Sequence, residues 1–184
     1  MGNIKKFENF DDAFVKRLRV IKEYSATNNF WDFVGMVEWD LCKLYPNNKT
    51  KYDIENIMDK CAPHYSWKKF KQFKKEYDKL YIYLYHRYRD VWLGDPGIEI
   101  SDDSYSDLIS SVIGYGKKHF MEIIMDDTNK NITEQGNSYD FCENFGYVFH
   151  ILYDEDSTHK SSKDRYLEIE DRWNKIYNSN NKNK

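Results

Sequence analysis

Carboxylates, a tryptophan, a proline and glycines concentrate in the segment 90–103, which we treat as a candidate functional loop. Its candidate residues are Asp90, Trp92, Asp95, Glu99, Asp102 and Asp103. Carboxylate oxygens suit a hard cation, and a pair of carboxylates can act as acid and base. Their spacing fits neither an EF-hand nor a two-metal nuclease. Asp102 or Asp103 is more simply the N-cap of a helix, so no catalytic residue is assigned.

A strip of lysines is the second candidate surface, because lysines recur every three or four residues in the segment 68–79. The strip comprises Lys68, Lys71, Lys75 and Lys79. Such a strip on one helix face can contact phosphates. The whole chain, however, has 28 basic and 31 acidic residues and a net charge of -3. This charge argues against a nucleic-acid partner and favours a solvated helix face.

No recognised metal or cofactor pattern occurs in the sequence, so we expect neither a metal nor a cofactor. The histidines lack paired metal-ligand spacing, and no glycine-rich phosphate loop is present. The cysteines, Cys42, Cys61 and Cys142, are odd in number and far apart, which is typical of reduced thiols. No run of 18 apolar residues and no apolar signal-peptide core occurs. We therefore expect a cytoplasmic protein without a membrane partner.

The elements that must position these residues are helices, because large apolar residues recur every three or four positions. The chain contains 16 Tyr, 11 Phe and 5 Trp among 184 residues. The longest apolar stripe consists of Trp67, Phe70, Phe73, Tyr77, Leu80, Leu84, Tyr88 and Val91. This spacing predicts one face of a helix of about seven turns, and Ser66 can cap it. A helix this long is expected to be the central packing element of the domain.

Shorter stripes predict further helices on both sides of the long one. The expected ranges are 11–24, 29–44, 52–59, a helix from Asp102 or Asp103 through Val112, 117–125, a helix from Ser138 or Asp140 through Leu152, and a last helix that includes 166–177. Asn29 is the expected N-cap of the second of these helices. Gly114 and Gly116 are expected to separate two helices, and 126–137 is expected to be a polar loop.

No segment shows the alternation of a strand, so the sequence predicts an all-α fold. We expect a single compact helical domain over residues 1–178, built around one long central helix. The residues 179–184 contain no apolar anchor and are expected to form a frayed polar tail.

Five short motifs, in order, resemble a bacterial family known as domain of unknown function 4240 (DUF4240). They are Phe-Trp-Asp-Phe-Val at 30–34, Asp-Val-Trp at 90–92, Ser-Asp-Asp with a following tyrosine at 101–105, Gly-Lys-Lys-His-Phe at 116–120 and Glu-Asn-Phe-Gly-Tyr-Val at 143–148. The resemblance covers residues 30–152 and lies in the order and spacing of the motifs. It implies a helical domain of bacterial or phage origin, and it implies no activity.

Three hypotheses about function follow from the sequence. The first is a protein-interaction module, of the inhibitor or immunity type, whose partner is another protein. It accounts for the lack of a catalytic set and for the excess of tyrosine, which often anchors interfaces. The second is a metal-assisted hydrolase or small-ligand enzyme that uses the loop 90–103. The third is a nucleic-acid-binding protein that uses the lysine strip.

Overall fold

The computed structural model describes residues 26–37, 54–93, 101–137, 144–153, 155 and 157–182. Within these ranges the secondary structure is helical and no strand occurs, which confirms the predicted all-α fold. The elements are α2 (Asn28–Met36), α4 (Ile54–Cys61), α5 (Trp67–Leu93), α6 (Asp102–Gly114), α7 (Lys117–Met125), α8 (Lys130–Asn137), α9 (Asn144–Tyr147), the 3₁₀ helix η2 (His150–Leu152) and α10 (Lys160–Asn181). The helix predicted over 11–24 lies outside the described residues.

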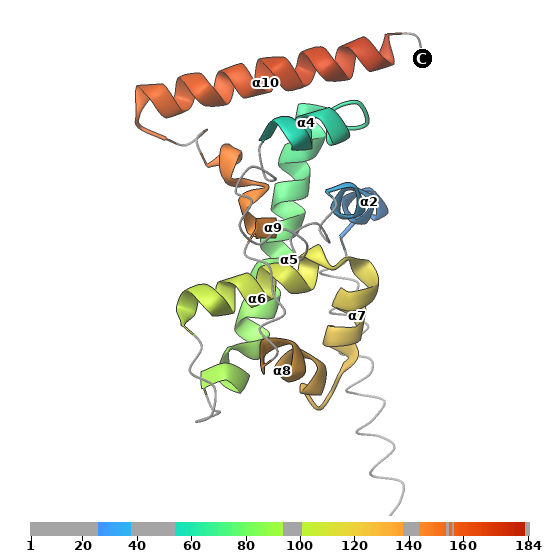
Figure 1. The fold of residues 1–184 in the computed structure, drawn as a ribbon, viewed down its shortest axis with the longest axis vertical. Helices are drawn as coiled ribbons and strands as arrows, with labels where there is room; N and C mark the ends of the chain where they lie inside the picture. The colour runs from blue at the N-terminus through green and yellow to red at the C-terminus, as the bar shows by residue number, and fades with distance from the viewer. Residues whose placement is uncertain are drawn as a thin grey trace, which may run out of the picture.

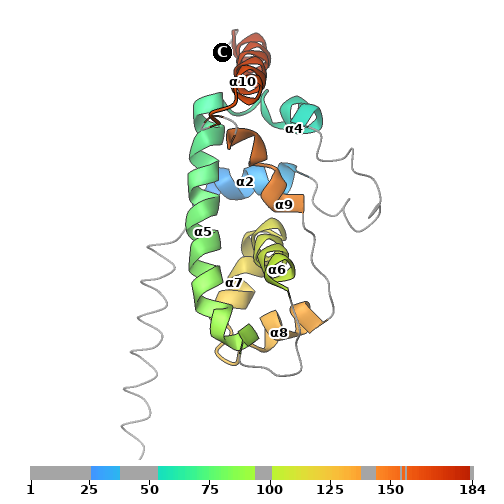
Figure 2. The ribbon, with the colours of Figure 1, turned by 90° about the vertical axis from the view of Figure 1, so that its left-hand side faces the viewer.

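The long helix α5 is the axis against which the other helices pack. Its N-terminus is capped by Ser66, whose hydroxyl accepts a hydrogen bond from the backbone N–H of Lys69 at 3.3 Å. The predicted stripe from Trp67 to Tyr88 is buried at every position, and only Val91, at its end, is partly exposed. Figures 1 and 2 show α2, α6, α7 and α9 on one side of α5. The prediction of one long central helix is therefore confirmed.

Helix α10 lies across the end of α5 at which that helix begins, as Figure 1 shows. The indole of Trp173 is fully buried, and its N–H donates to the carbonyl oxygen of Tyr65 at 2.7 Å. The indole N–H of Trp67 donates to the Tyr166 hydroxyl at 3.1 Å. At the end of α10, the side-chain amide of Asn181 donates to the carbonyl oxygen of Pro63 at 3.2 Å. The domain boundary predicted at residue 178 therefore lies inside this helix.

Two helices begin one or two residues earlier than the sequence predicts. The N-cap of α2 is Thr27 and not Asn29: the Thr27 hydroxyl accepts from the backbone N–H of Phe30 at 3.3 Å. The N-cap of α6 is Ser101 and not Asp102 or Asp103, because the Ser101 hydroxyl accepts from Ser104 N–H at 3.2 Å. Helix α2 ends at Met36, and the residues 38–44 of the predicted helix lie outside the described part.

The segment 126–137 is not the polar loop that the sequence predicts, because it contains α8. The carboxylate of Asp126 accepts hydrogen bonds from the backbone N–H groups of Thr128 at 2.9 Å and Asn131 at 2.7 Å. These bonds hold the pKa of Asp126 below its ordinary value. They also satisfy donors at the start of α8, and the buried Ile132 attaches this helix to the core. The start of α8 is therefore stabilised by the hydrogen bonds of Asp126, whereas most of the other helices are predicted by a periodic apolar face.

Glycines separate α6 from α7, as predicted. Helix α6 ends at Gly114, and α7 begins directly after Gly116, whose φ of 93° lies in the region that glycine adopts most readily. The helix predicted to end at Leu152 is interrupted: within 144–152 it consists of α9 and the separate 3₁₀ helix η2. None of the described helices has the length and apolar character needed to cross a bilayer.

Candidate functional site

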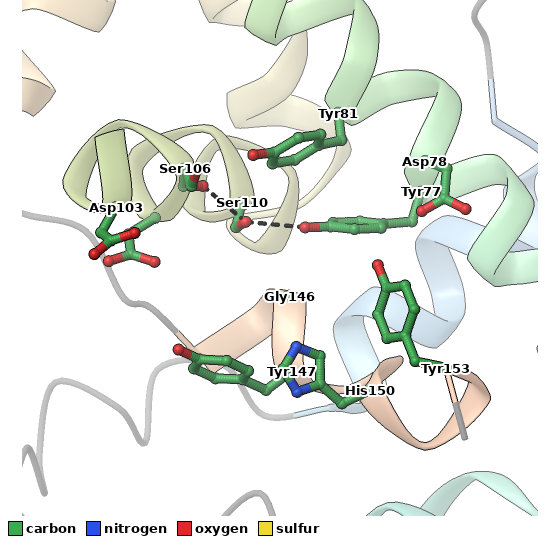
Figure 3. Close-up of a pocket in the computed structure, with 11 residues that line it drawn as sticks. Tyr77, Asp78, Tyr81, Asp103, Ser106, Ser110, Gly146, Tyr147, His150 and Tyr153 are labelled. Atoms are coloured by element: carbon green, nitrogen blue, oxygen red, sulfur yellow. Dashed lines mark hydrogen bonds between the residues drawn. The ribbon is translucent and has the colours of Figure 1, made fainter. Parts of the chain in front are cut away.

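A pocket of about 450 Å³ opens where α5, α6 and the α9–η2 segment meet. Figure 3 shows side chains from all three elements around the same space. The lining residues are Tyr77, Asp78 and Tyr81 from α5, Asp103, Ser106, Asp107 and Ser110 from α6, Gly146 and Tyr147 from α9, and His150 and Tyr153. The pocket is therefore built from segments that are far apart in sequence, and its lining is mostly aromatic and polar.

A chain of hydrogen bonds closes the inner wall, between α5 and α6. The Tyr77 and Ser110 hydroxyl oxygens lie 2.9 Å apart, and the Ser110 hydroxyl donates to the carbonyl oxygen of Ser106 at 2.9 Å. Because the Ser110 hydroxyl has one hydrogen, Tyr77 must be the donor to Ser110. Burial raises the pKa of Tyr77 above its ordinary value, so the phenol remains protonated and keeps donating.

A glycine allows the short helix α9 to approach this wall. A Cβ atom at position 146 would lie 3.2 Å from the Tyr77 hydroxyl oxygen and 3.3 Å from the Ser110 hydroxyl oxygen. Both distances are shorter than ordinary van der Waals contact, so only glycine leaves the two hydroxyl groups undisturbed at this spacing. Gly146 therefore determines how closely α9 packs on α5 and α6.

The outer rim consists of Tyr147, His150 and Tyr153, which follow one another at intervals of three residues. The His150 ring lies between the two tyrosine rings, with centroid distances of 4.6 Å to Tyr147 and 5.5 Å to Tyr153, in edge-on geometry. The tyrosines are 45% and 54% exposed, respectively, and are among the largest exposed apolar groups in the described residues. The rim thus presents aromatic surface to solvent.

Every charged residue that lines the pocket is acidic. Asp78, Asp103 and Asp107 contribute carboxylates, and no lysine or arginine is among the lining residues. A lysine is nevertheless close by: the ammonium group of Lys74 lies 2.6 Å from the Asp78 carboxylate and 4.5 Å from the centroid of the Tyr153 ring. A carboxylate and a tyrosine ring at the edge of the pocket therefore already hold a cation.

The serine hydroxyl at the inner wall of the pocket is engaged by the backbone. A serine nucleophile needs a base within hydrogen-bonding distance. The Ser110 hydroxyl instead donates to the backbone carbonyl oxygen of Ser106. Outside the pocket, burial raises the pKa of the Cys61 thiol to about 12, which disfavours a reactive thiolate. These side chains support the fold and the shape of the site.

The candidate residues of the loop 90–103 do not come together in one site within the described part of the chain. Asp103 is exposed and lines the pocket, whereas Asp90 is exposed on α5 and is not among the lining residues. Asp95 and Glu99 lie outside the described residues, and of Trp92 and Asp102 only the helical backbone is described. In the described ranges, no group of three or more His, Cys, Asp or Glu side chains is placed to hold a metal ion.

The lysine strip is not a uniform basic surface. Lys68, Lys75 and Lys79 are exposed on α5. Lys71 lies between them and its ammonium group pairs with the Glu155 carboxylate at 2.9 Å and bonds to the Tyr166 hydroxyl at 3.4 Å. The ion pair neutralises the central charge of the strip, which weakens its attraction for a row of phosphates.

Of the residues that line the pocket, only Asp103 is a candidate from the sequence. Tyr77 and Tyr81 belong to the apolar stripe of the predicted long helix, which indicates core. One signal was available for the rim: Tyr147, His150 and Tyr153 recur every three residues and lie outside the apolar positions predicted for their helix. Their proximity to Tyr77 and Tyr81 arises only from tertiary packing.

Comparison with known protein families, curated proteins and solved structures yields no match to this chain. The assignment of function therefore depends on the chemistry of the pocket itself.

Proposed function

We propose that this chain is a protein-interaction module of the inhibitor or immunity type, and that the pocket rim is its binding surface. The observation that carries the proposal is the exposure of Tyr147 and Tyr153 at the mouth of a polar pocket. Tyrosine is enriched in interfaces because a rigid ring supplies apolar contact area and a hydroxyl supplies a hydrogen bond. A pocket between such rings offers a partner the central anchor point that hot spots require.

The alternatives have less support from the described residues. The enzyme hypothesis depends on carboxylates of the loop 90–103, of which only Asp103 lies at the pocket. The nucleic-acid hypothesis depends on the lysine strip, in which Lys71 is paired with Glu155. Binding by the tyrosine rim uses side chains that are exposed, contiguous and beside a concave site. We therefore favour the interaction module.

The proposal is tested by capturing the partner with a tagged wild-type chain and with two variants. Tyr147→Ala with Tyr153→Ala removes the rim, whereas Leu167→Ala removes a similarly exposed apolar side chain, 50% exposed, on helix α10, which does not line the pocket. Bound proteins from the host cell are quantified by mass spectrometry. We expect one stoichiometric protein with the wild type and with Leu167→Ala, and its loss with the rim variant.

Two results contradict the proposal. One is a partner that the rim variant captures as well as the wild type does, which places the interface elsewhere. The other is the absence of any stoichiometric protein from the wild-type preparation under conditions in which the tagged chain is folded. Circular dichroism of all three proteins shows whether folding is equal.

A further inference from the structure

We infer that the pocket between α5, α6 and the α9–η2 segment receives an arginine side chain of the partner protein. The inference rests on the proposed function and adds the chemistry of the group that is recognised. It is carried by the charge of the lining, by its aromatic walls and by the cation already held at its edge.

Charge complementarity selects a cation. The pocket lining contributes the carboxylates of Asp78, Asp103 and Asp107 and no lysine or arginine. The Asp78 carboxylate is already paired with Lys74 at 2.6 Å, so the attraction for a further cation arises on the α6 side of the pocket, where Asp103 lies. Asp103 is exposed and forms no ion pair with any described residue, so its charge faces the pocket and solvent. Figure 3 shows Asp103 on the α6 side, opposite Tyr153. A positive group that enters beside Asp103 gains attraction that an anion or a neutral group does not.

The contacts of Lys74 show that groups at the edge of the pocket can bind a cation. Its ammonium group lies over the Tyr153 ring at 4.5 Å while its charge is balanced by Asp78 at 2.6 Å. This combination of a tyrosine face and a carboxylate stabilises a cation by both ion pairing and cation–π attraction. The same two kinds of group line the rest of the pocket, where Tyr81 and Tyr147 supply aromatic rings and Asp103 supplies a carboxylate.

A guanidinium group suits this part of the pocket better than an ammonium group. It is planar, so it can stack on a tyrosine ring while its N–H groups, which lie in the plane of the group, reach carboxylate oxygens. An exposed rim at Tyr147 and Tyr153 also favours a side chain that is attached to a larger surface, because those rings can contact the residues beside the arginine. We therefore commit to a partner arginine rather than to a free small cation.

The test uses short peptides as probes and the ¹⁵N-labelled full chain as the protein. The peptides are acetyl-Gly-Gly-X-Gly-Gly-amide, in which X is arginine, lysine or citrulline, the uncharged isostere of arginine. Backbone amide shifts are followed by NMR during each titration. We expect the arginine peptide to shift amides of 103–110 and 146–153 in a saturable manner. Citrulline should produce no saturable shift, and lysine should bind more weakly than arginine.

The role of the pocket carboxylates in binding the arginine peptide is tested with two double variants that each remove two negative charges. Asp103→Asn with Asp107→Asn removes two negative charges at the pocket, whereas Asp164→Asn with Glu168→Gln removes two from the exposed face of α10. The pocket variant should bind the arginine peptide about tenfold more weakly, because it loses charged hydrogen bonds to the guanidinium group. The α10 variant should bind as the wild type does. Unchanged amide spectra away from the pocket verify that both variants fold.

Three results would overturn the inference. They are equal binding of the arginine and citrulline peptides, a pocket variant with wild-type affinity, and tighter binding of free L-arginine than of the arginine peptide, which would indicate a small-molecule site. If the captured partner still requires Tyr147 and Tyr153 in these cases, the interaction module stands and only the arginine assignment is lost. If the rim variant also captures the partner normally, the proposed function fails independently.

Discussion

The hydroxyl of Tyr77 on α5 donates a hydrogen bond of 2.9 Å to the hydroxyl of Ser110 on α6, and the Ser110 hydroxyl donates a hydrogen bond to the Ser106 carbonyl oxygen. Both side chains are almost fully buried at the inner wall of the pocket. The bond therefore joins the central helix to the helix that contributes Asp103 and Asp107, and it fixes the spacing of the two walls.

The first prediction concerns the coupling of these two hydroxyl groups. Tyr77→Phe should cost about 1 kcal/mol of unfolding free energy, because one buried hydrogen bond is lost. Ser110→Ala should cost about 1–3 kcal/mol, because the buried Tyr77 hydroxyl loses its acceptor. The double variant should cost less than the sum of the two. Urea denaturation measures all three, with the exposed Tyr147→Phe as the control. Additive costs would show that the hydroxyl groups are not coupled.

The second prediction concerns Gly146. Gly146→Ala should destabilise the fold, because the added methyl group meets the Tyr77 and Ser110 hydroxyl oxygens at 3.2 and 3.3 Å. Gly35→Ala in α2 is the matched control, since nothing lies within 4 Å of its Cβ position. That control should gain about 0.4–1 kcal/mol through the lower entropy of the unfolded chain.

Gly146→Ala is also made in the Tyr77→Phe protein, which separates the contact with the Tyr77 hydroxyl from other effects at position 146. In Tyr77→Phe, the nearest contact of the new methyl group is removed, so Gly146→Ala should be tolerated better there than in the wild type. Thermal unfolding of the four proteins gives the comparison. An equal loss of stability in both backgrounds would mean that the Tyr77 hydroxyl does not limit the approach of α9.

The helices could be predicted from the sequence where a periodic apolar face forms them. The stripe of α5 from Trp67 to Tyr88 is buried at every position because its spacing matches one helix face. The predicted N-caps of α2 and α6 were wrong because several capping residues stand in a row, Thr27 to Asn29 and Ser101 to Asp103, and side-chain preference alone does not choose among them. Helix α8 was missed because the Asp126 cap, and not an apolar stripe, stabilises its start.

The pocket could not be predicted, because it depends on tertiary packing. Tyr77 belongs to the apolar stripe that predicts core, and it is buried, whereas Ser110 is a buried polar residue that no sequence pattern selects. Only the packing of α9 beside them, permitted by Gly146, creates a recess lined by their hydroxyl groups. The carboxylate of Asp103 was selected from local composition, but its relation to Tyr153 and His150 is a property of the assembled fold.

The third prediction concerns Cys61 at alkaline pH. Burial raises the pKa of its thiol from 9.0 to about 12. The folded state therefore keeps the proton after the unfolded state has lost it, and the unfolded state gains stability above pH 9. The free energy of unfolding should be unaffected by this group below pH 9 and should decrease as the pH rises from 9 to about 12.

Urea denaturation across this pH range measures the effect, and Cys61→Ala should show a shallower decrease than the wild type. The raised pKa values of the buried Tyr77 and Tyr105 act in the same direction, so some decrease remains in the variant. Peptide mapping after treatment with iodoacetamide gives a second readout. Alkylation of Cys61 in the folded protein at neutral pH, at the rate of a free thiol, would contradict its burial.

The central claim is that the rim of Tyr147, His150 and Tyr153 is the surface that binds a partner. Hydrogen–deuterium exchange of the full chain, alone and with the captured partner, tests it most directly. We predict that the partner slows exchange in 103–110 and 146–153 and leaves α10 unchanged. Slower exchange confined to α10 or to the lysine face of α5, with the pocket segments unaffected, would contradict the claim.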